Sequence, residues 1–130
     1  GDGPELKKLK KNAPSNVEFT GKCSRESLEQ YYKNARGLIF PGIEDFGIVP
    51  VEAQSFGCPV IACAGGGALE TVINGKTGVY FYEQTAEAVR EAVYESEDTR
   101  YNVSDFEKNI KRFTNSSFRK KFIREVENII

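Results

Sequence analysis

The stretch RGLIFPGIEDFGIVPVEAQSFGCPVIACAGGGALET, residues 36–71, decides how this chain folds. It contains two short apolar runs, LIF at 38–40 and VIA at 60–62, and each is followed by a glycine-containing loop that leads toward a helix. Continuous apolar runs of this length are typical of parallel strands that are covered on both faces. The loops after such strands gather at one edge of the sheet, where α/β proteins bind ligands. Because carboxylates stand beside both loops, we expect a site for phosphate or sugar there.

The segment between the two apolar runs is predicted to be a helix over residues 49–56. Pro50 suits the first turn of a helix, where a missing N–H costs nothing. Gly57 suits the position after the last turn, and Pro59 prevents the helix from continuing. The stretch therefore reads as strand, loop, helix, strand, loop and the start of another helix.

Strands and helices continue to alternate on both sides of this stretch. Residues 17–20 alternate between apolar and polar as a strand does, and residues 77–81 read as one more strand. Helices are expected over residues 4–12, from Ser24 onward, over 68–73 and over 85–95. This order predicts an α/β fold, a Rossmann-like parallel sheet with helices on both faces. Four strands are few for such a sheet, so we expect an N-terminal strand to be missing from this chain.

Two of these helices carry clear apolar stripes. The helix that starts at Ser24 can be capped by the Ser24 hydroxyl. Its stripe is formed by Leu28, Tyr31, Tyr32 and Ala35, which recur at helical spacing and predict one buried face. The stripe of the helix over 85–95 is formed by Val89, Ala92 and Val93.

Residues 102–130 carry no strand signal and predict C-terminal helices. Residues 104–107, Ser-Asp-Phe-Glu, match a capping box that would start the first of them. A second helix is expected near Ser116, with an apolar stripe made of Phe118, Phe122, Val126 and Ile129. This stripe can dock on another part of the protein or pack on the sheet of this chain.

The totals exclude several classes of protein. The chain has 130 residues, 18 Lys and Arg against 19 Asp and Glu, and a net charge of -1, so it lacks the positive charge typical of nucleic-acid binding. No apolar run is long enough for a membrane span, and the start of the chain has no signal-peptide core. We expect a cytoplasmic protein. Short basic groups at residues 7–11 and 119–121 are either solvated helix faces or a peripheral contact with the inner face of a membrane.

The cysteine and histidine content argues against a metal site. The three cysteines include no CxxC pair, and the chain contains no histidine. Neither a zinc site nor a Cys–His nucleophile can easily be built from this set. We therefore expect three reduced, mostly buried cysteines and no zinc site.

Glu44 and Glu52 are the candidate polar groups of the central stretch. The N–H groups of Phe46, Gly47 and Ile48 stand where the loop enters a helix, and can approach a diphosphate at the positive end of the helix dipole. Glu52 would repel that diphosphate, so it suits vicinal hydroxyls such as those of a ribose. Glu44 can hold sugar hydroxyls or stabilise positive charge at a sugar carbon. The alternative is that the pair has no binding role, since a carboxylate near the start of a helix is favoured by the helix dipole alone.

The glycines at 65–67 form a second candidate anion site. They allow the backbone to turn tightly and to approach a ligand closely. Gly66 and Gly67 are the residues of this loop that we assign to the site. A plain tight turn explains the same glycines equally well.

The ordered motifs of the chain resemble those of retaining glycosyltransferases of family four, which have the GT-B architecture. The matching motifs are Pro41-Gly-Ile-Glu44-Asp-Phe-Gly47, Pro50-Val-Glu52-Ala53, Gly57-Cys-Pro59-Val-Ile-Ala62, Gly66-Gly67-Ala-Leu-Glu70-Thr71 and Gly75-Lys-Thr-Gly78, with Gly1-Asp-Gly-Pro4 and Phe19-Thr-Gly21 before them. Glu44 and Glu52 match the E-x7-E signature of that family. The residues within these motifs are most similar to those of a branch of GDP-mannose-dependent mannosyltransferases.

This resemblance implies a role for each candidate residue. Residues 1–130 would form one nucleotide-sugar-binding domain, the C-terminal half of a two-domain enzyme. Glu52 would bind the donor ribose, Glu44 and the backbone of residues 46–48 would meet the transferred sugar and its phosphates, and Gly21, Lys22 and Cys23 would lie near the base. GDP-mannose would be the donor, a glycan or lipid-linked molecule the acceptor, and no metal would be needed.

The resemblance also implies that parts of the enzyme lie outside this sequence. The Arg and Lys that clamp the diphosphate in the family precede the Gly1-Asp-Gly-Pro4 turn, and the acceptor-binding half is absent. We therefore expect the parent protein to be a hexosyltransferase and the isolated chain to be inactive. A non-catalytic nucleotide- or sugar-binding module is the main alternative. A glycosidase that uses Glu44 and Glu52 is a third, although a surface loop would poorly raise the pKa of an acid.

Overall fold

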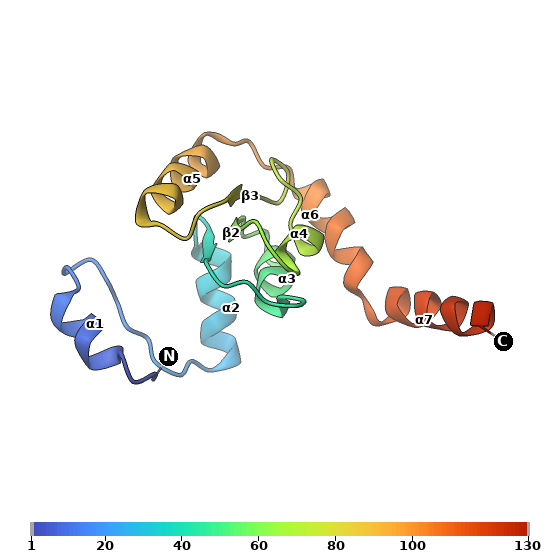
Figure 1. The fold of residues 1–130 in the computed structure, drawn as a ribbon, viewed down its shortest axis with the longest axis horizontal. Helices are drawn as coiled ribbons and strands as arrows, with labels where there is room; N and C mark the ends of the chain where they lie inside the picture. Colours follow the sequence, from blue (N-terminus) through green and yellow to red (C-terminus); the bar gives the residue numbers. More distant parts are fainter. Residues whose placement is uncertain (1, 130) are drawn as a thin grey trace. The chain divides into compact units, whose positions relative to one another are not determined.

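The computed structural model describes residues 2–129, so Gly1 of the first glycine turn lies outside the described residues. The chain divides into two compact units, residues 1–31 and 32–130, and each is described by itself. The larger unit contains the central stretch. Figure 1 shows its elements in chain order.

A parallel sheet forms the centre of the larger unit. Within residues 2–129 its strands are β1 (Leu38–Phe40), β2 (Val60–Cys63) and β3 (Gly78–Phe81), in the order β1-β2-β3. Leu38 lies opposite Val60, and Val60 lies opposite Gly78. The two apolar runs of the central stretch are thus neighbouring parallel strands, as the sequence predicts.

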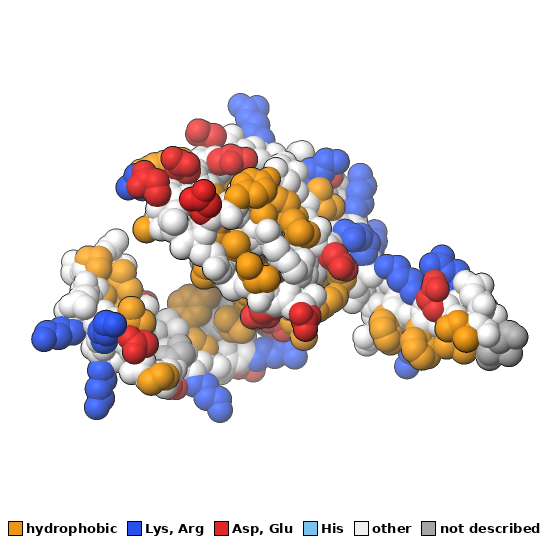
Figure 2. Space-filling model, viewed as in Figure 1, with side chains coloured by type: hydrophobic (Ala, Val, Ile, Leu, Met, Phe, Trp, Pro, Cys, Tyr) orange, Lys and Arg blue, Asp and Glu red, His pale blue; other side chains and the backbone are white. Residues whose placement is uncertain are grey.

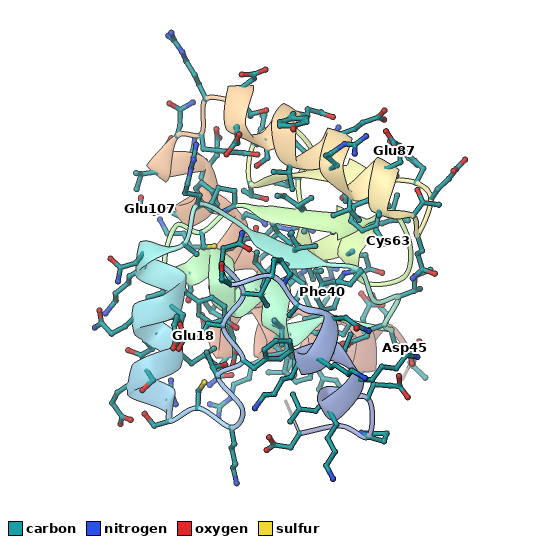
Figure 3. All side chains as sticks on the ribbon, turned by 90° about the vertical axis from the view of Figure 1, so that its left-hand side faces the viewer. Glu18, Phe40, Asp45, Cys63, Glu87 and Glu107 are labelled. Carbon is teal, nitrogen blue, oxygen red and sulfur yellow. The ribbon has the colours of Figure 1, made fainter. Side chains whose placement is uncertain are left out.

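Helices cover both faces of this sheet, which confirms the predicted fold class. The helices are α3 (Ile48–Ser55), α4 (Ala68–Thr71) and α5 (Ala86–Asp98). Because side chains alternate along a strand, β2 contributes Val60 and Ala62 to the cluster under α3 and α4, and Ile61 and Cys63 to the cluster under α5. Figure 3 shows Phe40 and Cys63 on opposite sides of the strands.

Local signals place the ends of these helices. Gly57 follows α3 with φ +76°, the left-handed conformation expected after a last helical turn. The Thr85 hydroxyl caps α5 by accepting a 3.2 Å bond from the N–H of Ala88. Ala92 is buried under α5, with Val89 and Val93 packed around the same cluster, so the predicted stripe is confirmed.

Tyr80 fastens β3 to the short helix α4. Its hydroxyl donates to the carbonyls of Val72 at 2.6 Å and Ala68 at 3.2 Å. Burial raises the pKa of the Tyr80 phenol, with a smaller contribution from Tyr82. The hydroxyl therefore satisfies carbonyls at the end of a helix that is only four residues long.

Replacing Tyr80 by phenylalanine is expected to lower the free energy of unfolding by about 1 kcal/mol, because these carbonyls lose a donor. Urea denaturation measures the change. Tyr82→Phe is the matched control, since Tyr82 is 78% exposed. Equal midpoints for the Tyr80 and Tyr82 variants would contradict this role of the Tyr80 hydroxyl.

Strand β1 is less covered than the sequence predicts. Ile39 points to the α5 face of the sheet but is 47% exposed. Helix α5 packs against β3 and β2, so the outer strand keeps part of this face open. A continuous apolar run identifies a strand, but it does not show how far a helix extends over it.

The smaller unit lacks a strand that we expected. It contains α1 (Leu6–Asn12) and leads into α2 (Arg25–Asn34), which crosses into the larger unit. Residues 17–20 are not a strand in the described structure, so this prediction is wrong. Alternating polarity marks a chain that can form a strand, but a strand also needs a neighbour to pair with, and a pattern cannot supply one.

The predicted buried face of α2 is only partly observed. The Ser24 hydroxyl accepts a 3.2 Å bond from the N–H of Ser27, as a capping residue should. Tyr32 is buried and its ring stacks on Phe56 with centroids 6.0 Å apart. Leu28 and Tyr31 are 37% and 44% exposed, and Ala35 is exposed as well. Helical spacing reveals the apolar side of a helix, but not the length over which something packs on it.

The C-terminal third consists of α6 (Val103–Ile110), a 3-10 turn η1 (Lys111–Phe113) and α7 (Asn115–Ile129). Asn102 stands at the N-cap of α6, two residues before Ser104, so the predicted start of this helix at the capping box is wrong. The apolar stripe of α7 is exposed over its length, with values between 38% at Val126 and 84% at Ile129. Figure 2 shows it as a row of apolar side chains.

This exposure rules out one of the two alternatives for α7, since its stripe does not pack on the sheet of this chain. The other alternative, that the stripe of α7 docks on another part of the protein, stays a prediction. In the part of the chain that the structure covers, no helix is long and apolar enough to cross a membrane.

Candidate functional site

Loops that follow all three strands meet at the carboxyl edge of the sheet. The N–H of Gly67, after β2, donates to the carbonyl of Glu44, after β1, at 2.7 Å. The side-chain amide of Gln84, after β3, donates to the carbonyl of Pro41 at 2.7 Å. The two glycine-containing loops that the sequence indicated are therefore joined by a hydrogen bond. The bond from Gln84 links the loop after β3 to them, and no sequence pattern indicated it.

Gly66 and Gly67 are required because the two loops approach so closely. Gly66 has φ +52°, and a Cβ there would overlap the carbonyl of Glu44. A Cβ on Gly67 would overlap the carbonyl group of Phe46. The two backbones approach so closely that only glycine fits at these two positions. Their contact with a donor stays a prediction.

The N-terminus of α3 is open to a ligand. Gly47 occupies its N-cap with φ +75° and supplies no side-chain cap. The first N–H groups of a helix, here from Ile48 onward, lack partners within the helix. Ile48 is 62% exposed and Phe46 is 46% exposed. Of the three residues expected to offer anion-binding amides, Phe46 and Ile48 are thus exposed next to the joined loops, whereas Gly47 is buried.

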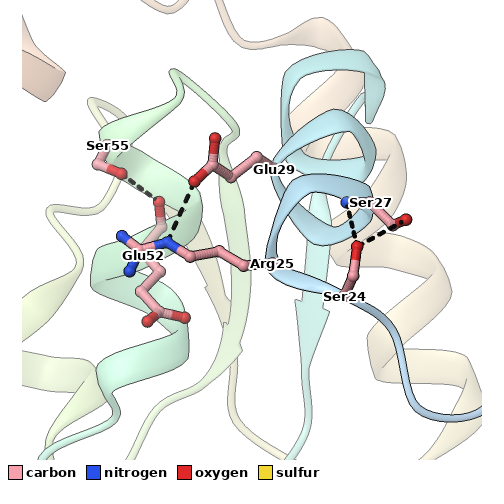
Figure 4. A network of polar contacts seen from close by, with 6 residues as sticks. All are labelled: Ser24, Arg25, Ser27, Glu29, Glu52 and Ser55. Atoms are coloured by element: carbon pink, nitrogen blue, oxygen red, sulfur yellow. Dashed lines mark hydrogen bonds and ion pairs between the residues drawn. The ribbon is translucent and has the colours of Figure 1, made fainter.

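Glu44 and Glu52 are both exposed carboxylates of the larger unit. Glu44 lies in the loop after β1, and Glu52 lies one turn into α3. Ser55 donates to the main-chain carbonyl of Glu52 at 2.6 Å, not to its carboxylate (Figure 4). Burial chiefly, and the Glu52 charge next, raise the pKa of the Tyr32 phenol.

The candidate residues for the base belong to the smaller unit. Gly21 has φ +64°, Lys22 is exposed, and the Cys23 thiol contacts the carbonyls of Thr20 and Gly21 at 4.0 and 3.9 Å. They form the loop that leads into α2. Their role near the base of a donor stays a prediction.

The cysteines form no disulfide in the described structure, and two of them are buried, as expected. All three are free, and Cys58 and Cys63 are buried. Burial raises the pKa of Cys58 to about 11. Over residues 2–129 no three His, Cys, Asp or Glu side chains gather closely enough to hold a metal ion. Independence from metals stays a prediction.

A buried network of polar side chains lies in the larger unit, and the sequence did not predict it. Gln54, Thr71 and Asn109 are each at most 1% exposed. The Asn109 amide donates to the Gln54 side-chain oxygen and to the Thr71 carbonyl, both at 2.8 Å, and the Gln54 amide donates to the same carbonyl at 2.9 Å. These residues come from α3, α4 and α6. Because they lie far apart in the sequence, no local pattern predicts that they meet.

Comparison with known proteins identifies the family. The family described as "Glycosyl transferases group 1" matches residues 1–121. The chain belongs to this family. Its larger unit therefore presents the joined loops of a group 1 glycosyltransferase domain.

Individual relatives agree with this membership. A GDP-mannose-dependent alpha-(1-6)-phosphatidylinositol monomannoside mannosyltransferase of Mycobacterium tuberculosis (strain CDC 1551 / Oshkosh) is 35% identical over 108 residues, which cover 73% of this chain and 28% of that protein. An alpha-1,3/1,6-mannosyltransferase of Dictyostelium discoideum is 44% identical over 63 residues, covering 48% of this chain and 15% of that protein. The chain thus spans well under a third of the length of these relatives.

A solved structure supports the fold of this group 1 domain. Sucrose-phosphate synthase from Thermosynechococcus elongatus matches with a TM-score of 0.76 and 27% sequence identity. The match covers 97% of this chain and 34% of that protein. The parallel sheet with its helices is the GT-B type of α/β fold that the sequence predicts.

Proposed function

We propose that this chain binds the nucleotide-sugar donor of a retaining hexosyltransferase of family four that transfers mannose from GDP-mannose to a glycan or lipid-linked acceptor. The observation that carries the proposal is the 2.7 Å bond between the Gly67 N–H and the Glu44 carbonyl, which joins the two loops next to the open N-terminus of α3. Two mannosyltransferase relatives support the choice of sugar, and the name of one includes GDP-mannose.

On the larger unit, the diphosphate, the ribose and the sugar of the donor each have a partner of suitable chemistry. The amides at the start of α3 suit the diphosphate, because unpaired N–H groups and the helix dipole both favour negative charge. The Glu52 carboxylate, one turn further, suits the ribose hydroxyls. Glu44 lies ahead of the helix, at the end where the sugar would project. The base is assigned to Gly21, Lys22 and Cys23.

The proposed reaction needs charge stabilisation more than bond-forming groups on this chain. As the sugar leaves the diphosphate, its anomeric carbon becomes positively charged and the diphosphate gains negative charge. The amides of residues 46–48 would stabilise the leaving diphosphate. The Glu44 carboxylate would stabilise the sugar carbon, while the acceptor attacks from the same face. We propose that transfer needs no metal and takes place in the cytoplasm, where a lipid-linked acceptor would be met at a membrane surface.

Donor titration tests this assignment. Calorimetry with GDP-mannose, UDP-glucose, UDP-N-acetylglucosamine and ADP-glucose is expected to show selective binding of GDP-mannose. Replacing Glu52 by alanine is expected to weaken that binding by about a hundredfold, because the ribose loses its charged hydrogen bonds. Glu91→Ala, which removes an exposed glutamate from α5, is the matched control and should bind as the wild type does.

Two results would count against the proposal. Selective binding of another donor would overturn the mannose assignment while keeping the donor site. Unchanged affinity in the Glu52 variant would overturn the ribose role. Sugar transfer by the full-length protein separates an enzyme from a non-catalytic binding module with the same loops.

A further inference from the structure

Helix α4 is a single turn that depends on its neighbours. It spans only Ala68–Thr71, and a helix of this length has almost no stability of its own. At its N-terminal end, the N–H of Gly67 holds the Glu44 carbonyl at 2.7 Å. Any shift of α4 would therefore move the loop that carries Glu44.

The C-terminal end of α4 is held by side chains from the segment 109–113. Asn109 caps the Thr71 carbonyl at 2.8 Å. The Arg112 guanidinium donates to the carbonyl of Glu70 at 3.2 Å and to the side-chain oxygen of Asn109 at 2.7 Å. These bonds satisfy the last carbonyls of α4, which have no partner within the helix. The segment therefore fixes α4 from the end opposite to Glu44.

The same segment also touches the loop after β1 directly. The Phe113 ring meets the edge of the Phe46 ring, with centroids 5.9 Å apart and planes at 77°. The Arg112 guanidinium lies over the Phe113 ring, 5.1 Å from its centroid. Aromatic pairs in this geometry are attractive beyond their buried area. Segment 109–113 thus holds the loop by two routes, one through α4 and one through Phe46.

We propose that Asn109, Arg112 and Phe113 are positioning residues for the sugar end of the donor: they hold α4 and Phe46, and thereby the loop that carries Glu44. This inference rests on the proposed donor-binding function. None of the three is assigned a contact with the donor. Their effect should appear in how well the site distinguishes a nucleotide sugar from the nucleotide without its sugar.

Two measurements on the full-length protein test this inference. Hydrogen exchange at the Gly67 N–H measures, without any ligand, how often its bond to the Glu44 carbonyl opens. Calorimetry compares the affinities for GDP-mannose and for GDP. Phe113→Leu and Arg112→Gln are expected to speed exchange at Gly67 about tenfold and to weaken GDP-mannose about fivefold. The loss for GDP should be clearly smaller, because GDP lacks the sugar that Glu44 would meet.

Matched variants separate positioning from loss of the fold. Phe113→Tyr keeps the ring and should restore both values to those of the wild type. Tyr94→Leu makes the same kind of change on α5, where the ring is 60% exposed, and should have no effect. Arg112 is exposed, so its variant remains informative if Phe113→Leu lowers the melting temperature.

Other outcomes would overturn the inference. Unchanged exchange at Gly67 in both variants would show that the segment does not hold the loop. Equal weakening of GDP-mannose and GDP would indicate a general loss of structure. A wild-type protein that binds neither ligand would count against the proposed function, and the exchange rates alone would then decide whether segment 109–113 holds the loop.

Discussion

Gly78→Ala is expected to destabilise the chain by about 4 kcal/mol or more, which is most of the free energy of unfolding of a domain at the low end of the usual range of about 5–15 kcal/mol. Gly78 begins β3 opposite Val60, and a Cβ at this position would overlap the backbone N, C and O atoms of Val60. Val60 is itself fully buried in the central strand. The clash therefore cannot be relieved by rotating a side chain, and the two strands would have to separate.

Urea denaturation followed by circular dichroism measures this effect. Gly42→Ala is the matched control, because a Cβ at Gly42 would meet only the end of the flexible Glu44 side chain, at 3.9 Å. The control should stay within about 0.5 kcal/mol of the wild type. A Gly78 variant that unfolds at the wild-type urea concentration would contradict the pairing of β2 with β3.

Glu44→Gln is expected to lower kcat/KM for sugar transfer by the full-length protein by about a hundredfold or more, while affinity for GDP stays unchanged. On the proposed assignment, the carboxylate stabilises positive charge that develops at the sugar carbon only as the donor bond breaks. Glutamine keeps the size and the hydrogen-bonding oxygen of the side chain but removes this charge. The loss should therefore appear mainly in kcat.

Asp45→Asn provides the control for Glu44→Gln. It removes one negative charge from the next residue of the same exposed loop, so it reproduces any general change in surface potential. Initial rates over a range of GDP-mannose concentrations separate kcat from KM. Equal losses in the two variants would show that Glu44 acts only through the charge of the loop, and an active Glu44 variant would remove it from the reaction.

Acidic side chains also gather along α5 and just before it, where Glu83, Glu87, Glu91 and Glu95 line a hollow of about 390 Å³ together with Tyr82. Figure 2 shows this acidic group on the larger unit. It lies on the helix that covers the far face of the sheet from α3 and α4. The donor site that we propose does not use these residues, and Glu91 therefore serves as a neutral control position.

Much of the fold follows from local patterns in the sequence. Apolar runs identified β1 and β2, Pro50 and Gly57 bounded α3, and helical spacing identified the buried face of α5. These features are local, because a backbone conformation or a turn depends on residues close together in the chain. The sequence also identified both loops of the candidate site, since glycines and carboxylates follow each apolar run.

Tertiary structure alone decided which patterns found a partner. Residues 17–20 have the polarity of a strand but pair with none in the described structure, and the stripe of α7 has the spacing of a buried face but stays exposed. Likewise, the bond from Gly67 to Glu44 and the contacts of Asn109, Arg112 and Phe113 join residues far apart in the chain. Pairing, burial and buried hydrogen bonds depend on what the rest of the chain brings near, and periodicity carries no information about that.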